Sequence, residues 1–222
     1  MTSPSQKPLK ALALNATLKT SQQQSSTKRL LSYVESELRP FGVLTEHVLL
    51  SAFNIAPGVQ PDEAGDDEWP QLRQKIIEAD IVLIGTPIWL GQPSRVCKRA
   101  LERMDAFLSE TDGKNRMPSY GRVAAVAVVG NEDGAHHVSA ELLQALNDVG
   151  FTVPANAVTY WVSEAMQSTN FVDLSEIPDA VVNATKLLVS NCVHLAAALR
   201  AQPYPGFHSP CDPSLLRARM RS

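Results

Sequence analysis

The fold of this chain is decided at Ile81-Val82-Leu83-Ile84-Gly85-Thr86-Pro87-Ile88-Trp89-Leu90-Gly91. Its first four residues are apolar and three of them are β-branched, which is typical of a strand buried on both faces. Gly, Thr and Pro follow at 85–87, and they predict a tight turn at the carboxyl end of that strand. In open parallel sheets ligands bind in the crevice at this end, so we expect a ligand site near residues 86–91.

Apolar runs and helical periodicities alternate on both sides of this stretch. Besides 81–84, the expected strands cover 9–14, 43–50, 122–129 and a fifth run at 151–153 and 157–161, interrupted at Pro154. Apolar residues recur at helical spacing in the segments between them, and Ser, Gly and Pro mark the ends. The expected helices cover 25–38, 68–79, 94–108, 134–149 and 179–200.

This alternation predicts one doubly wound α/β domain. Five parallel strands match the flavodoxin-like order 2-1-3-4-5, with helices on both faces of the sheet. We expect this domain to span residues 9–201, between a disordered N-terminus at 1–8 and an extended C-terminal tail at 202–222. Strands one, three and four lie side by side in that order. The loops 15–27, 86–91 and 130–134 should therefore meet at one edge.

Composition excludes several classes of protein. The 222 residues are 44% hydrophobic and 19% charged, with a net charge of -3, so we expect neither nucleic acid nor an anionic membrane as a partner. No apolar run reaches about 18 residues, the length that a membrane span needs. The polar start lacks a signal-peptide core, so a cytoplasmic protein is expected. Three cysteines far apart and the adjacent His136 and His137 show no metal-ligand spacing.

The first of the three loops is rich in hydroxyl groups and precedes a helix. It contains Thr17, Lys19, Ser25, Ser26 and Thr27. A helix N-terminus offers unpaired N–H groups and a partial positive charge, and added hydroxyl donors make it suitable for a phosphate. Taken alone, an ordinary polar loop with a serine cap explains these residues better than a phosphate site does. No Rossmann or Walker glycine motif follows the strand.

The second loop combines a turn with an aromatic side chain. Thr86 can offer its hydroxyl to a ligand, Pro87 constrains the turn, and 88–91 can present backbone N–H groups and the ring of Trp89. The alternative is that Trp89 packs in the core under the next helix. Its position in a turn, rather than on a helix face, favours a ligand contact.

The third loop, Gly130-Asn131-Glu132-Asp133-Gly134, precedes another predicted helix. Its backbone N–H groups are suited to hold the edge of a ring system, and Gly134 permits a left-handed conformation. Glu132 and Asp133 are also favourable at a helix start because of the helix dipole. Glu132 and Asp133 can belong to a ligand-binding loop and also stabilise the start of the helix, so the two interpretations are compatible with each other.

Together these segments resemble a known family. Thr86-Pro87-Ile88-Trp89-Leu90-Gly91-Gln92-Pro93-Ser94 is similar to the T-P-I-[WY]-x-G-x-P-S segment of flavodoxin-like NAD(P)H-dependent FMN reductases. The segment 130–137 resembles the third flavin loop of one branch of that family. Residues 17–19 and 25–27 resemble its phosphate loop, although this loop is long and contains no glycine.

The resemblance implies an FMN-dependent enzyme that moves hydride from NAD(P)H to a quinone, flavin or similar small-molecule electron acceptor. FMN would be bound without a covalent link, its phosphate at 17, 26 and 27 and its ring against the other two loops. The resemblance names no catalytic side chain, and it implies a homodimer or homotetramer with Tyr160 and Trp161 as candidate interface residues. The candidate cofactor-binding residues are Thr17, Lys19, Ser25, Ser26, Thr27, Thr86, Pro87, Ile88, Trp89, Leu90, Gly91, Gly130, Asn131, Glu132, Asp133 and Gly134.

Two other functions stay open from the sequence. A flavodoxin-type electron carrier would hold the same flavin, but such carriers are strongly acidic and this chain is not. A cofactor-free flavodoxin-like module for regulation or interaction is compatible with the glycine-free first loop. A hydrolase is disfavoured because no G-x-S-x-G motif is present.

Overall fold

The structure, a computed structural model, describes residues 7–164 and 168–206. Its strands form one sheet in the order β2-β1-β3-β5-β6, in which every neighbouring pair is parallel, and β4 pairs with β3 outside this path. The strands are β1 (Lys10–Asn15), β2 (Leu44–Leu49), β3 (Ile81–Trp89), β4 (Gln92–Pro93), β5 (Val123–Gly130) and β6 (Val158–Val162). The predicted flavodoxin-like order of the five parallel strands is confirmed.

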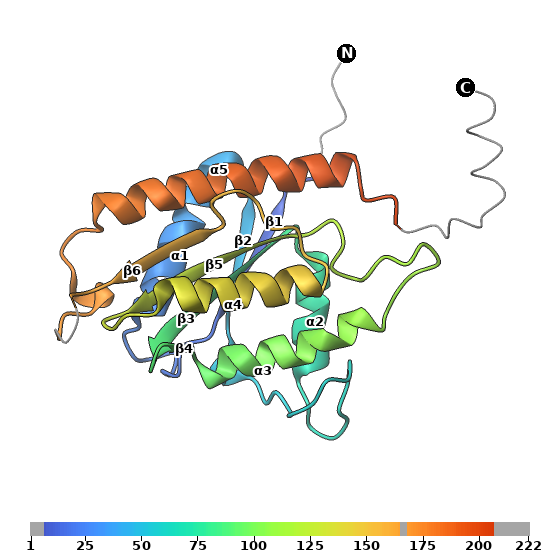
Figure 1. Ribbon diagram of the computed structural model, residues 1–222, viewed down its shortest axis with the longest axis horizontal. Coiled ribbons are helices and arrows are strands. Elements are labelled where there is room, and N and C mark those ends of the chain that lie inside the picture. The colour runs from blue at the N-terminus through green and yellow to red at the C-terminus, as the bar shows by residue number, and fades with distance from the viewer. Residues whose placement is uncertain (1–6, 165–167, 207–222) are drawn as a thin grey trace, which may run out of the picture.

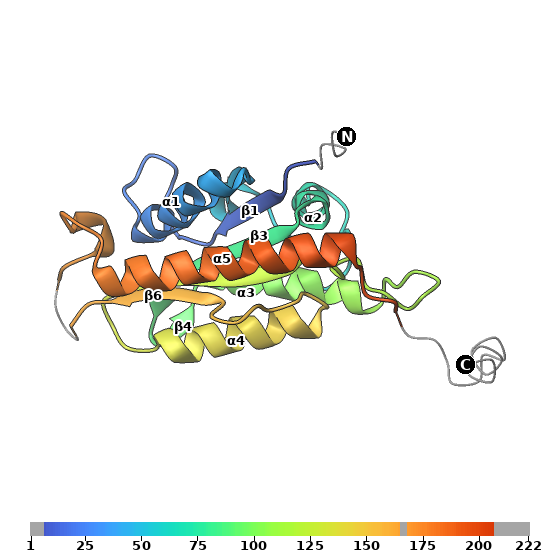
Figure 2. The ribbon, with the colours of Figure 1, turned by 90° about the horizontal axis from the view of Figure 1, so that it is seen from above.

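Within the described residues, five α-helices cover the sheet, and they lie on both of its faces as predicted (Figure 1). Helices α1 and α5 pack on one face and lie against each other, as Figure 2 also shows. Helices α2, α3 and α4 pack on the opposite face. The helices are α1 (Ser26–Leu38), α2 (Trp69–Glu78), α3 (Arg95–Met104), α4 (Ala135–Asp148) and α5 (Asp179–Ala201), with short 3-10 turns η1 (Arg39–Phe41), η2 (Leu50–Ala52), η3 (Asp105–Leu108) and η4 (Phe171–Asp173).

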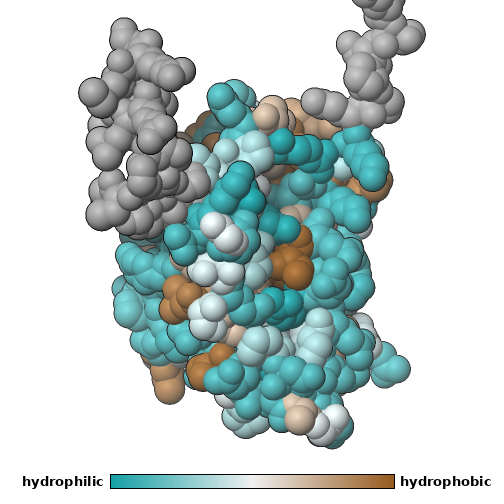
Figure 3. Space-filling model, turned by 90° about the vertical axis from the view of Figure 1, so that its right-hand side faces the viewer, coloured by the Kyte–Doolittle hydropathy of each residue, from teal (hydrophilic) through white to brown (hydrophobic). Residues whose placement is uncertain are grey.

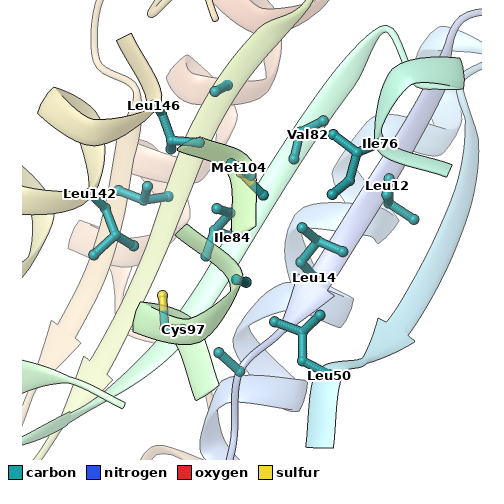
Figure 4. Close-up of a cluster of buried hydrophobic side chains, with 14 of the residues drawn as sticks. Leu12, Leu14, Leu50, Ile76, Val82, Ile84, Cys97, Met104, Leu142 and Leu146 are labelled. Carbon is teal, nitrogen blue, oxygen red and sulfur yellow. The ribbon is translucent and has the colours of Figure 1, made fainter. Parts of the chain in front are cut away.

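The core consists of two apolar layers, one on each face of the sheet. Figure 4 shows part of the layer under α2, α3 and α4, where side chains of β1 and β3 meet those of the three helices. Strands β3 and β5 are buried on both faces over almost their whole length. Burial of this kind is the main source of stability of a parallel sheet. It holds the carboxyl ends of the strands in place.

The predicted strand 81–84 was too short. Strand β3 continues through Gly85, Thr86 and Pro87, which pair in register with residues 127–129 of β5. The predicted turn at 85–87 was therefore wrong. Strand β1 ends at Asn15, opposite Gly85, so Pro87 lies where β3 no longer pairs with β1 and a proline without N–H is tolerated.

The chain turns at Leu90 and Gly91, beginning three residues after Pro87, and closes a hairpin that was not predicted. Leu90 and Gly91 have φ angles of 52° and 72°, and they reverse the chain into β4, which pairs antiparallel with the end of β3. Glycine adopts such an angle at little cost, whereas leucine does so rarely. The hairpin places Trp89 at the tip of β3.

The last parallel strand was predicted in two pieces and only one is present. Strand β6 covers Val158–Val162, whereas Thr152 makes only an isolated bridge with Val123. Pro154 separates the two pieces, as expected from its missing N–H group. The start of α1 and α3 was predicted well, because Ser25 and Ser94 cap these helices by accepting from the N–H groups of Lys28 and Cys97.

Helix α5 is the one described helix that is long and apolar enough, by length and composition, to cross a membrane. Its face with Val181, Leu188, Val189, Cys192 and Ala196 is buried on the sheet and α1. A core helix of a soluble domain passes the same composition test.

The two ends of the described chain lie against the domain. Arg200 of α5 forms an ion pair with Asp80 and donates to the carbonyls of Lys7 and Pro8. Tyr204 contacts the Tyr120 ring and shares a hydrogen bond with Thr152. The rest of the predicted N-terminal segment and tail, residues 1–6 and 207–222, lies outside the described residues.

Candidate functional site

The three loops meet at the carboxyl ends of β1, β3 and β5, as predicted, and they enclose a cleft. In Figure 1 the arrowheads of β3 and β6 point toward this end of the molecule. The residues that line the cleft come from the first loop, the end of β3, the end of β5 and the segment around η4. They are Thr17, Leu18, Lys19, Ser25, Ser26, Thr27, Pro87, Ile88, Trp89, Val129, Gly130, Asn131, Trp161, Asn170 and Phe171.

One end of the cleft is the N-terminus of α1. Ser25 caps the helix, and the backbone N–H groups of Ser26 and Thr27 have no acceptor among the residues that the structure describes. The Thr27 hydroxyl likewise makes no hydrogen bond within the described chain. A helix of 13 residues contributes a partial positive charge at this point. This end of the cleft is therefore suited to an anion.

Lys19 is the charged residue of the lining, and the described lining contains no acidic side chain. The ammonium group of Lys19 donates to the carbonyl of Gln24 at 2.7 Å, and the backbone N–H of Lys19 donates to the Thr17 hydroxyl at 3.3 Å. These bonds hold the first loop closed next to the helix N-terminus. The balance of charge in the cleft is thus positive.

Aromatic side chains also line the cleft. Trp89 is 56% exposed, so the alternative that it packs in the core under the next helix is wrong. Trp161 of β6 packs against the fully buried Phe171, with ring centroids 5.6 Å apart. Flat apolar surfaces of this kind suit a planar ring system.

Helix α1 also holds the wall of the cleft that contains Phe171. The Nη1 atom of Arg29 donates to the carbonyls of Phe171, Val172 and Leu174 at 2.7–2.9 Å, and the guanidinium lies over the Phe171 ring. The Ser26 hydroxyl accepts from the N–H of Val172 at 3.1 Å. The segment around η4 is therefore attached to the helix whose N-terminus faces the cleft.

Thr86, a predicted ligand contact, lies outside the cleft lining. It is fully buried, and its hydroxyl donates to the Pro87 carbonyl and accepts from the N–H of Ser94, both at 3.0 Å. The Ser94 hydroxyl in turn donates to the carbonyl of Ala16 at 2.6 Å. The Ser94 hydroxyl therefore connects the second loop to the first, whereas the Thr86 hydroxyl bonds only within residues 86–94.

Five more predicted contacts lie outside the cleft lining, namely Leu90, Gly91, Glu132, Asp133 and Gly134, and all but Asp133 bring the second and third loops together. The Glu132 carboxylate accepts from the N–H of Leu90 at 2.8 Å. Gly134 has a φ of 121°, and a Cβ there would lie 2.9 Å from the Cα of Gly91. This close approach explains the glycine at 134.

The prediction missed five lining residues, Leu18, Val129, Trp161, Asn170 and Phe171. Leu18 and Val129 adjoin predicted residues in sequence. Trp161 was assigned to an interface, and Asn170 and Phe171 lie between the expected strand at 157–161 and the expected helix at 179–200, where no element was predicted. Phe171 is an aromatic residue in a polar stretch of sequence. Such a residue indicates that its segment packs against other apolar groups.

The two described cysteines offer no thiolate for chemistry. Burial raises the pKa of the Cys97 thiol to about 12, which hydrogen bonding to Thr86 and the charge of Lys98 only partly offset. Burial alone raises the pKa of Cys192 to about 12 as well. Both thiols stay protonated near neutral pH, in agreement with a site that uses no cysteine nucleophile.

A wider cavity, of about 520 Å³, lies far from these loops, between Tyr120, Asn147, Phe151, Thr152 and Tyr204. The cleft itself encloses about 170 Å³. Figure 3 views the end of the molecule away from the cleft, where the surface is mostly hydrophilic with small separate hydrophobic areas. The wider cavity contains none of the residues predicted to bind a ligand, so size alone does not identify the site.

Comparison with protein families shows which cofactors the protein uses. Residues 9–167 match the family described as NADPH-dependent FMN reductase. The chain belongs to this family. Members of the NADPH-dependent FMN reductase family use FMN and NADPH, which confirms the two predicted cofactors. The chain is thus an FMN-dependent oxidoreductase by family, and its electron acceptor and further substrates are left open by that membership.

Two curated proteins are similar to this NADPH-dependent FMN reductase family member over most of its length. It is 35% identical over 209 residues to 8-demethyl-8-aminoriboflavin-5'-phosphate synthase of Streptomyces davaonensis, covering 88% of this chain and 80% of that protein. It is also 35% identical over 200 residues to the divalent metal cation transporter MntH of Mycobacterium bovis, covering 87% of this chain. The chain spans only 29% of the length of that transporter.

Solved structures agree with the family. A crystal structure of RosB with the bound intermediate 8-demethyl-8-formylriboflavin-5'-phosphate superposes with a TM-score of 0.82 and 32% identity, covering 96% of this chain and 88% of that one. The apo form of the NADH:FMN oxidoreductase EMOB has a TM-score of 0.62 at 16% identity, covering 93% of this chain and 98% of that one. The second likeness concerns the fold alone.

Proposed function

We propose that this protein binds FMN in the cleft and transfers hydride from NAD(P)H, through the flavin, to a quinone, a free flavin or a similar small acceptor. The observation that carries the proposal is the N-terminus of α1, with its two unpaired N–H groups and the Thr27 hydroxyl, in a cleft whose described lining has Lys19 and no acidic group. A phosphate monoester is the ligand group that such a position favours.

The FMN phosphate would lie at Ser26 and Thr27, with Lys19 and Thr17 beside it. The ring would lie toward Trp89 and Asn131. Sites for ligands of this size usually enclose about 300–1,000 Å³, and the cleft encloses about 170 Å³. Part of the flavin would therefore extend past Trp89 into solvent, where a second reactant can reach it.

Bound flavin would supply the redox chemistry, accepting two electrons and returning them to an acceptor. The chain's own part is to hold and orient the ligand. Backbone N–H groups near Asn131 would offset negative charge on the ring edge. The aromatic wall of Trp161 and Phe171 would exclude water from one side. No side chain is assigned a proton-transfer role.

The first test is the absorption spectrum of the purified protein, before and after incubation with FMN. We expect flavin bands at close to one FMN per chain, followed by oxidation of NADPH or NADH when a quinone is added. A protein that binds FMN but oxidises neither nucleotide would be an electron carrier of the flavodoxin type. A protein that stays colourless would be a cofactor-free module, and the proposal would fail.

A second candidate function is chemistry on the flavin itself. Its support is the likeness to the synthase, which at 35% identity and 80% coverage is named for a flavin altered at position 8. In this case FMN would be a substrate instead of a resident cofactor. Mass spectrometry of the flavin recovered after incubation with the protein distinguishes the two, because a resident cofactor keeps the mass of FMN.

Replacing Thr27 with alanine should weaken the binding of FMN by about five- to tenfold, the size expected for a hydrogen bond to a charged group. The binding of riboflavin, which lacks the phosphate, should change by less than about twofold. Titration by flavin fluorescence measures both. Thr20→Ala, an exposed threonine of the same loop, serves as the control. Equal losses for both ligands would remove Thr27 from the phosphate site.

Replacing Trp89 with alanine should weaken FMN and riboflavin alike, by about tenfold, because the lost contact is with the ring. The free energy of unfolding should change by less than about 0.5 kcal/mol, since the side chain is 56% exposed. Leu90→Ala is the matched control, because Leu90 is more exposed and lies outside the cleft lining. Unchanged affinity in Trp89→Ala would separate this ring from the flavin.

We further propose a cytoplasmic location and a homodimer or homotetramer, in keeping with the expectation from the family. Trp161 now has a place in the cleft wall, so Tyr160 is the better candidate for an interface: it is 38% exposed and contacts the His136 ring. Sedimentation of the wild type and Tyr160→Glu tests this assignment.

A further inference from the structure

A chain of hydrogen bonds enters the first loop from the side of the sheet. Glu35 of α1 bonds Nδ1 of His47 at 3.1 Å, and Nε2 of His47, on β2, bonds the Asn15 amide at 3.2 Å. The Asn15 side chain then accepts from the N–H of Thr17 at 3.1 Å. Asn15 and Glu35 are both buried, so water competes little for these bonds.

The donors and acceptors of this chain allow one arrangement. A backbone N–H can only donate, so the atom of Asn15 that faces Thr17 is the oxygen. The NH₂ group of Asn15 therefore faces His47, and Nε2 of the imidazole must accept from it. The proton of the neutral ring is then on Nδ1, where it donates to the Glu35 carboxylate.

We infer that His47 is a positioning residue for the phosphate-binding loop, and that it acts through Asn15 and Thr17 only in its neutral form. This inference rests on the proposed function, since it concerns the loop assigned to the FMN phosphate. His47 lies outside the cleft lining, and no sequence pattern singled it out. It determines which way the Asn15 amide points.

A second proton on His47 would break the arrangement. Nε2–H would then face the NH₂ group of Asn15, so two donors would meet. If the amide turned over to accept from Nε2–H, its NH₂ group would face the N–H of Thr17 instead. In either case the loop loses a buried hydrogen bond.

The charged groups around His47 do not change how the orientation of the Asn15 amide depends on the protonation of His47. Glu35, from α1, accepts the Nδ1 proton in both states of the ring, so the change is confined to Nε2. Glu46 pairs with Lys75 of α2, and as the strand neighbour of His47 it points to the opposite face of β2. Lys19, in the loop itself, donates to the Gln24 carbonyl.

The first arm of the test needs no flavin. Hydrogen exchange at the Thr17 amide, followed by NMR in the apo protein, reports its bond to Asn15 directly. We expect His47→Phe to raise this exchange rate by about fivefold or more, since one buried hydrogen bond is lost. His47→Gln should leave it near the wild-type rate, because the glutamine oxygen can accept from Asn15. His194→Phe, an exposed histidine of α5, is the matched control.

The second arm measures the dissociation constants of FMN and riboflavin. His47→Phe should weaken FMN by about fivefold or more and riboflavin by less than about twofold, whereas His47→Gln should change neither by more than about twofold. As the pH is lowered, wild type should lose FMN affinity relative to His47→Gln once His47 gains its second proton. The FMN phosphate titrates as well, but its titration affects the affinity of wild type and of His47→Gln equally and therefore cancels in the comparison.

These arms separate the two proposals. If wild type binds no FMN, the proposed function fails, and the exchange rate of Thr17 still decides whether His47 positions the loop. If FMN binds normally but His47→Phe leaves both the Thr17 exchange rate and the FMN affinity unchanged, the inference is overturned. Should His47→Phe not fold, parallel pH profiles of wild type and His47→Gln would overturn it equally.

Discussion

Replacing Asp67 with alanine is expected to lower the free energy of unfolding by about 3–5 kcal/mol, the cost of leaving a buried charge without its partner. Asp67 and Arg103 have no exposed side-chain surface, and Nη2 of Arg103 lies 2.7 Å from the Asp67 carboxylate. The same guanidinium donates to the carbonyls of Ala56 and Gln60 and lies over the Trp69 ring. Without the carboxylate, the positive charge of Arg103 has no counterion in this pocket.

Urea unfolding measures this loss. Glu102→Ala is the control, because Glu102 forms an exposed pair with Arg99 at 3.7 Å and should contribute less than about 0.5 kcal/mol. The loss of unfolding free energy in Asp67→Asn, which keeps one acceptor, should fall between the losses in Asp67→Ala and Glu102→Ala. A loss below about 1 kcal/mol in Asp67→Ala would show that water or a neighbouring group compensates Arg103.

The pH dependence of stability should show the same pair. Burial by itself raises the pKa of Asp67, but the hydrogen bond from Arg103 and those from the N–H groups of Glu63, Ala56 and Trp69 outweigh it and hold the pKa well below its usual range. A group of this kind stabilises the fold fully above its unfolded pKa, about 3.9 for aspartate. The stability difference between wild type and Asp67→Asn should therefore shrink as the pH falls below about 4.

Replacing Arg29 with methionine should lower the free energy of unfolding by about 2–4 kcal/mol, because three partly buried carbonyls lose a charged donor. It should also weaken FMN binding, since the wall of the cleft that contains Phe171 depends on this donor. Lys28→Met, a change of the exposed neighbour on the same helix, should alter neither property. Thermal unfolding and FMN titration measure the two effects.

A separation of these two effects would be informative. If Arg29→Met lost stability but kept its affinity for FMN, the segment around η4 would be a structural element and the Phe171 wall would not contact the ligand. Faster hydrogen exchange at the Val172 amide, which donates to Ser26, would locate the loosened segment directly.

Most of the fold was predictable because its signals are local. Four apolar residues at 81–84, the alternation of strands with helices and the serines that cap α1 and α3 each depend on a few neighbouring residues. The extension of β3 was not predictable in this way. Gly85, Thr86 and Pro87 favour a turn locally, but pairing with β5 on one side keeps them extended.

The candidate site was predictable in part. Ten of the sixteen predicted residues line the cleft, because loops that follow neighbouring parallel strands must converge. The six others do not line it, and two of them show why: the Thr86 hydroxyl bonds the N–H of Ser94, and the Glu132 carboxylate accepts from the N–H of Leu90, so both polar groups take protein partners. A sequence does not show which of two available partners a polar group takes.

By itself the sequence determined the order of elements, the edge of the sheet at which three loops meet and the family to which they belong, because repeated patterns of apolar and turn residues carry this information. Tertiary structure alone decided the aromatic wall and the route from His47 to Thr17. Arg29, which is 142 residues away in the chain, holds Phe171 in the cleft wall. Glu35 of α1 is connected to the first loop by hydrogen bonds through His47 of β2 and Asn15. Such contacts depend on the packing of α1 against the sheet, which no short stretch of residues encodes.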